Sequence, residues 1–225
     1  MRMVKHAILS IGFLMAGPLA AQTTVVTFDN GGEGWDGNGL VEQDGGNPGA
    51  NFHFFVNNFG IEARNDTNTA FIGDLTGASE VTVGADALTN SIQFEGTEVS
   101  RELIVEFRSS SLAQDGYPYT SVWYDLGTIQ ASPEWGTFQI TFTPSSTELP
   151  AGWGGYGAED PITFEPILPP GVTFADVMAS VDELAFTTVE PGFFYGFADF
   201  DVRFDNLFID RTVDTDTVFG NGFDP

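Results

Sequence analysis

Hydrophobic residues alternate with polar ones along much of this chain. The alternation is clearest in residues 102–108, 137–143 and 200–205, where one face is apolar and the other is polar or charged. Period two with one apolar face is typical of half-buried antiparallel strands. One residue departs from this pattern, because Ile104 falls on the polar face of residues 102–108. Shorter strands are predicted at residues 24–28, 51–56, 69–72, 91–94, 121–126 and 183–189.

Only one segment has the pattern of a helix. Thr173 and Asp176 have the spacing of a capping box, with Asp in place of the usual Glu, and they open a helix of at most two turns at residues 175–181. Glycine- and asparagine-rich turns separate the predicted strands. Together these elements predict an all-β fold, a single antiparallel β-sandwich of jelly-roll type with one short helix, over residues 22–210.

The first 21 residues differ in composition from the rest. A basic start precedes an apolar run over residues 8–20, and small residues precede Gln22. This layout predicts a secretory signal peptide at residues 1–21, and therefore a secreted protein. The apolar run is shorter than the ~20 residues that span a bilayer, and no second such run follows. No integral membrane segment is therefore expected.

The other end of the sequence, residues 211–225, is expected to be an acidic tail. Its segment 218–224 resembles the ending of many exported proteins of Gram-negative bacteria. An extra edge strand or a frayed end explains the same residues, since chain ends often lack fixed structure.

The chain is strongly acidic. Its formal net charge is −25, and after residue 21 its 32 acidic residues face only five arginines. Such a chain repels nucleic-acid phosphates and anionic lipid headgroups, so neither is expected as a partner. Two compatible interpretations of the acidity remain. It keeps the protein soluble, or some carboxylates chelate a hard cation such as Ca²⁺.

Residue counts limit the catalytic chemistry. The chain has no cysteine, which excludes disulfides, thiolate metal sites and a thiol nucleophile. His53 is the one histidine after residue 21, which excludes a multi-histidine zinc site and favours a structural place for His53 over a catalytic base. Two carboxylates suffice for a glycosidase, but the Glu-x-Asp-x-Glu pattern of sandwich-type glycosidases is absent. No catalytic residue is therefore assigned.

Three short motifs resemble known secreted modules. Residues 28–35 resemble the opening of many jelly-roll modules, and the Gly-Gly-Asn-Pro-Gly turn at residues 45–49 is similar to one in laminin B (laminin IV) type domains. Residues 204–209 resemble the last strand of these domains and of carbohydrate-binding modules. The resemblance extends over roughly residues 25–210 and implies a jelly-roll fold.

The same resemblance implies a structural Ca²⁺ where the first and last strands meet. Carried over to this sequence, it points to Asp29, Asn30 and Asp205 as ligands. The alternative is ordinary turn chemistry, because Asp and Asn before a pair of glycines are common turn formers.

Aromatic side chains in loops are the usual means of holding sugars, since a flat ring stacks on the apolar face of a pyranose. Trp153 and Tyr156 lie in a glycine-rich segment, and Trp135 lies in a long insert, so these three are candidate ligand-binding residues. Core or rim packing is the alternative for each. The sequence thus predicts a secreted, non-catalytic binding or surface module that recognises an extracellular glycan or matrix polymer. The alternatives are a structural or adhesive exterior protein with only calcium bound, or a glycoside hydrolase.

Overall fold

The computed structural model describes residues 20–213 of the chain. The predicted signal peptide, apart from its last two residues, and the segment 214–225 of the predicted tail lie outside the described residues. Within residues 20–213, no helix has both the length and the apolar character needed to cross a membrane.

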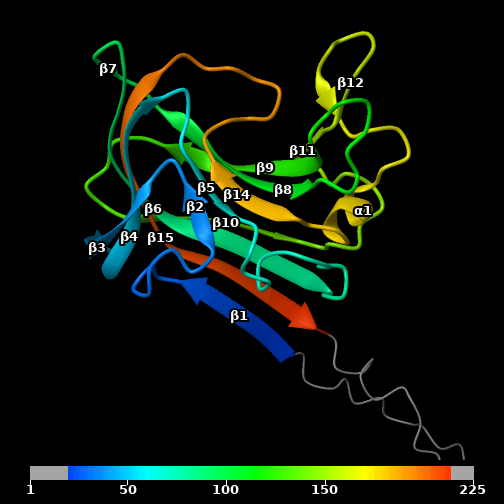
Figure 1. Cartoon of the computed structure of the whole chain (residues 1–225), viewed down its shortest axis with the longest axis horizontal. Helices are drawn as coiled ribbons and strands as arrows, with labels where there is room; N and C mark the ends of the chain where they lie inside the picture. Colours follow the sequence, from blue (N-terminus) through cyan, green and yellow to red (C-terminus); the bar gives the residue numbers. More distant parts are fainter. Residues whose placement is uncertain (1–19, 214–225) are drawn as a thin grey trace, which may run out of the picture.

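Two antiparallel sheets stack against each other (Figure 1). The first has the order β10 (Gly136–Phe142), β6 (Glu80–Phe94), β15 (Ala198–Val213), β4 (Gly49–Asn58) and β3 (Leu40–Gly46), with β1 (Ala20–Val26) also on β15 and β7 (Thr97–Glu98) on β6. The second has the order β11 (Trp153–Tyr156), β9 (Thr120–Ile129), β8 (Arg101–Ser109), β14 (Glu183–Thr187), β5 (Glu62–Asn65) and β2 (Trp35–Gly37). The short strands β12 (Ala158–Glu159) and β13 (Pro166–Ile167) form a separate hairpin.

The order of the strands is that of a jelly roll. Strands β4, β6, β10 and β15 lie in the first sheet, whereas β5, β8, β9 and β14 lie in the second. The sheets therefore read β4-β15-β6-β10 and β5-β14-β8-β9, which is the arrangement of two Greek keys in eight strands. The long strand β15 is central, because β4 pairs with its first half and β1 with its second half. The predicted all-β sandwich is confirmed.

The core between the sheets is rich in phenylalanine. Phe54 and Phe204 from the first sheet and Phe107 and Phe186 from the second are fully buried. Each of these lies at an apolar position of an alternating strand, which is why the alternation predicted the strands. Burial of such side chains is the main stabilising contribution, worth about 1.5–3 kcal/mol for each one removed from water.

Ile104, the residue that departs from the alternation, lies beside an irregularity in the sheet. The pairing of β8 with β9 shifts register between Leu103 and Ile104, which pair with Gly127 and Asp125, so β9 has one extra residue at this point. Ile104 is buried, although it shares the outer face of β8 with Glu106 and Arg108.

The helix α1 begins as predicted but is shorter. It spans Phe174–Met178, and the capping box is present: the Thr173 hydroxyl accepts from the Asp176 N–H at 3.1 Å, and the Asp176 carboxylate accepts from the Thr173 N–H at 2.8 Å. Other elements also differ from expectation. The strand predicted at residues 69–72 is wrong, because these residues form a turn. The glycine-rich segment Trp153–Tyr156 is the strand β11, and β15 continues to Val213, three residues into the expected tail.

Candidate functional site

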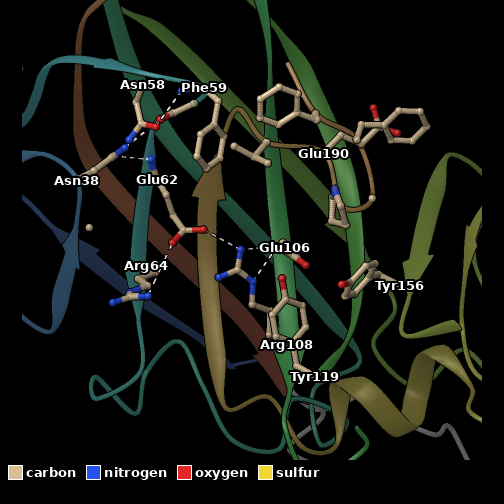
Figure 2. Close-up of a pocket in the computed structure, with 17 residues that line it drawn as sticks. Asn38, Asn58, Phe59, Glu62, Arg64, Glu106, Arg108, Tyr119, Tyr156 and Glu190 are labelled. Atoms are coloured by element: carbon tan, nitrogen blue, oxygen red, sulfur yellow. Dashed lines mark hydrogen bonds and ion pairs between the residues drawn. The ribbon is translucent and has the colours of Figure 1, made fainter. Parts of the chain in front are cut away.

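A cavity of about 570 Å³ lies on the outer face of the second sheet (Figure 2). Side chains from β5 and β8 form its polar floor, because they alternate with the core-facing residues of the same strands. The segments around Asn38, Asn58 and Glu190 form its sides. The lining includes Asn38, Asn58, Phe59, Glu62, Arg64, Glu106, Arg108, Tyr119, Tyr156, Val189, Glu190, Pro191, Phe193 and Phe194.

Arg108 is at the centre of the floor, with 11% of its side chain exposed. Its Nε donates to Glu106 at 2.7 Å, and its Nη2 lies 2.6 Å from Glu106 and 2.8 Å from Glu62. Its Nη1 donates to Glu183 at 2.5 Å. The three carboxylates come from three adjacent strands, β5, β8 and β14, so the sheet itself fixes this cluster.

Glu106 is the most buried member of the cluster, with 1% of its side chain exposed. Its second oxygen accepts from the Ser121 hydroxyl at 2.6 Å. Burial raises the pKa of Glu106, and the neighbouring Arg108 only partly offsets this. Burial lowers the pKa of Arg108, but the charges of Glu106 and Glu62 raise it by more, so the guanidinium stays protonated.

Two tyrosines cover one end of the floor. The ring of Tyr119 lies 5.1 Å from the Arg108 guanidinium and 5.4 Å from the ring of Tyr156. The first of these is a cation–π contact. Burial raises the pKa of both phenols, and the charge of Glu106 raises them further, so both are neutral O–H groups at neutral pH.

The opposite rim is aromatic and open to solvent. Phe59, Phe193 and Phe194 line the cavity, and Phe194 is 76% exposed. The rings of Phe59 and Phe194 are 5.9 Å apart, and Phe59 also contacts Phe197 at 6.1 Å. Exposed apolar patches rimmed by polar residues are typical of interaction sites and ligand-binding grooves.

The structure brings one of the three predicted sugar-binding aromatics to this cavity. Tyr156 lines it, whereas Trp135 lies outside it and is only partly exposed. Trp153 is 8% exposed and packs in the core, 5.0 Å from Phe142 and 4.9 Å from Phe174. The expectation that a glycine-rich loop exposes Trp153 is therefore corrected, because that segment is a strand whose alternation turns the ring inward.

The predicted calcium ligands lie around the turn at residues 45–49. Asp29 accepts from the Ala50 N–H at 3.1 Å, and Asp205 is buried and accepts from the N–H groups of Asn47 and Asn206. Burial raises the pKa of Asp205, and the charges of Asp86 and Asp29 raise it further.

Two of the three predicted Ca²⁺ ligands, Asp29 and Asp205, have carboxylate oxygens near the same turn. Both carboxylates already accept hydrogen bonds from backbone N–H groups in or beside that turn. The Asn30 side chain is exposed and makes no hydrogen bond within residues 20–213. In the same part of the chain, no three acidic or histidine side chains are placed to hold a metal ion. Calcium binding stays a prediction.

His53 lies on the other sheet and does not face the cavity. Its two ring nitrogens are 2.9 Å from Glu42 and 2.8 Å from Asp201. Glu42 lies on β3 and Asp201 lies on β15, the two strands that flank β4. His53 thus has a structural place on β4, between two carboxylates of the first sheet.

The charged floor was not among the predicted site residues. The alternation of residues 102–108 had already put Glu106 and Arg108 on a polar face, and a charged pair in mid-strand was the available signal. No local signal connects them to Glu62 and Glu183, which lie 46 and 75 residues from Arg108.

No family model and no curated protein sequence matches the chain. Among solved structures, one described as "Structural analysis of an exo-beta-agarase" is similar, with 10% identity, a TM-score of 0.48 and coverage of 84% of this chain. This chain spans 25% of the length of that protein. A likeness at this TM-score carries no argument about function, so the laminin B and carbohydrate-binding-module resemblance stays a prediction beyond the sandwich fold.

Proposed function

We propose that this chain is a secreted, non-catalytic module that binds an extracellular glycan in the cavity on the second sheet. The observation that carries the proposal is the composition of that cavity. Charged and amide groups cover its floor and one side, and aromatic rings form its rim.

The chemistry of the lining matches a sugar. Each sugar hydroxyl both donates and accepts a hydrogen bond, and the cavity offers acceptors in Glu62 and Glu190 and a donor in the Asn58 amide. The rings of Tyr156 and Phe194 offer flat apolar surfaces for the C–H faces of a pyranose. A largely preformed pocket with a few fixed polar groups is the usual form of a small-molecule site.

The contacts of Glu106 favour binding over hydrolysis. A general acid must be free to give its proton to the leaving oxygen of the substrate. Both oxygens of Glu106 are already engaged, one by Ser121 and the other by Arg108. Glu62 shares the same arginine, because its Oε2 accepts from the Arg108 Nη2 at 2.8 Å. The cluster therefore supports a rigid binding floor.

The test is affinity electrophoresis of the protein through gels that contain different soluble polysaccharides. Tyr156→Ala should weaken retardation by the bound polysaccharide by roughly tenfold, as for an aromatic ring that stacks on the ligand. Phe55→Ala is the matched control, because Phe55 is 78% exposed on the other sheet and outside the cavity. Equal effects of the two variants would place binding elsewhere.

The same samples separate the alternatives. Reducing ends released from a bound polysaccharide would show a hydrolase. Retardation by no polysaccharide, in a protein that folds normally, would favour the structural or adhesive alternative.

A further inference from the structure

The charges that line the cavity do not balance. Two cations, Arg64 and Arg108, line it together with three carboxylates, Glu62, Glu106 and Glu190. This excess of negative charge bears on which saccharide the cavity accepts, and the following argument rests on the proposed function.

Both arginines are already paired with acids of this chain. All three nitrogens of the Arg108 guanidinium are engaged by Glu62, Glu106 and Glu183. The Nε of Arg64 donates to Asp36 at 2.8 Å and lies 3.9 Å from Glu183. A carboxylate or sulfate on an incoming sugar would thus find each cation already neutralised by an acid of this chain.

Glu190 adds a carboxylate with no compensation. Within residues 20–213, its side chain makes no hydrogen bond or ion pair, although it lines the cavity beside Pro191 and Phe193. Burial raises its pKa, and the nearby charge of Asp125 raises it further, which is the behaviour of an acid in a partly buried, negative environment. An anionic ligand placed against Glu190 meets like charge in a partly desolvated site.

We infer that the cavity selects saccharides that carry no carboxylate or sulfate groups, and that Glu190 is a specificity-determining residue for this choice. The ligand class is an uncharged polysaccharide.

The experiment compares each neutral polymer with a charged polymer of the same backbone, by affinity electrophoresis at pH 8 and low salt. Suitable pairs are dextran with dextran sulfate, hydroxyethylcellulose with carboxymethylcellulose, and methyl-esterified with de-esterified galacturonan. The neutral member of the recognised pair should bind at least about tenfold more tightly than the charged member. Added salt should lower this ratio of affinities, because it screens the repulsion between the charged polymer and the carboxylates of the cavity.

Glu190→Gln should also lower the ratio of the affinity for the neutral polymer to the affinity for the charged polymer. It should do so by raising the affinity for the charged polymer several-fold. The control is Glu148→Gln, which makes the same change in net charge at an exposed residue outside the cavity. A charged member that binds as tightly as its neutral partner, with binding lost in Tyr156→Ala, would overturn the inference while the proposed function stands. An unchanged ratio in Glu190→Gln would remove Glu190 from its assigned role. Retardation by no member of any pair would overturn the proposed function, and the inference with it.

Discussion

Replacing Arg108 with methionine should destabilise the fold strongly, because three carboxylates would lose their common partner. Glu106 is the decisive one, since it is 1% exposed and would keep only the Ser121 hydroxyl. Removing one partner of a buried ion pair leaves an uncompensated charge and costs about 3–5 kcal/mol. Whole domains are stable by only about 5–15 kcal/mol, so the loss is a large share of the total.

The measurement is urea denaturation of purified protein, with the free energy of unfolding compared between variants. Arg64→Met is the matched control: it removes the same charge from a neighbouring residue whose side chain is 46% exposed. A surface pair of this kind contributes about 0–1 kcal/mol. In the double variant Arg108→Met/Glu106→Gln, about 2 kcal/mol of the loss should be recovered, because the buried charge is gone.

The loss of unfolding free energy in Arg108→Met should also depend on pH. Burial already raises the pKa of Glu106, and removing Arg108 removes an influence that lowers it. A carboxyl whose pKa is higher in the folded state than in the unfolded state holds its proton more tightly when folded. Stability therefore falls as pH rises above the ordinary value of 4.5, up to the raised value. Arg108→Met should lose more stability at pH 8 than at pH 5. A loss below about 1 kcal/mol, or an equal loss in the Glu106→Gln background, would refute this reasoning.

Three further predictions concern other parts of the molecule. Gly154→Ala should cost about 1–3 kcal/mol in the same unfolding assay, because its Cβ would lie 2.1 Å from the Trp123 ring, whereas Gly77→Ala, with nothing within 4 Å, should be nearly neutral. Millimolar Ca²⁺ should raise the melting temperature relative to EDTA by mass action, and the rise should be absent in Asp205→Asn; an equal rise with Mg²⁺ would indicate charge screening alone. Intact-mass measurement of protein from its native host should show a chain that starts within two residues of Gln22, and a chain that keeps Met1 would contradict the predicted signal peptide.

The strands were the part of the fold that the sequence predicted best. Residues 137–143 and 200–205 alternate with period two, and both form strands of the first sheet. This works because a strand with one face in the core needs apolar side chains only at every second residue. The capping box at Thr173 was equally readable, since its two hydrogen bonds connect residues three apart.

Features that depend on a partner strand could not be predicted from the sequence. The register shift beside Ile104 depends on the partner strand β9, and the inward direction of Trp153 depends on β11 pairing with β9. A glycine-rich segment is equally consistent with a loop and with a strand until its partner is known. For Trp153, the two alternatives were an exposed ring in a loop and a buried ring in the core. Only the pairing of β11 with β9 distinguishes them.

The sequence by itself determined a cysteine-free, acidic chain of alternating strands, and with it the sandwich and the kinds of chemistry excluded. The tertiary structure alone decided the site. It placed Glu62, Glu106 and Glu183 around Arg108 and put an aromatic rim beside them. The physical reason is range: alternation and capping act between near neighbours in the chain. Electrostatic pairing acts across space, between strands whose order in the sheet is set by the topology of the whole fold.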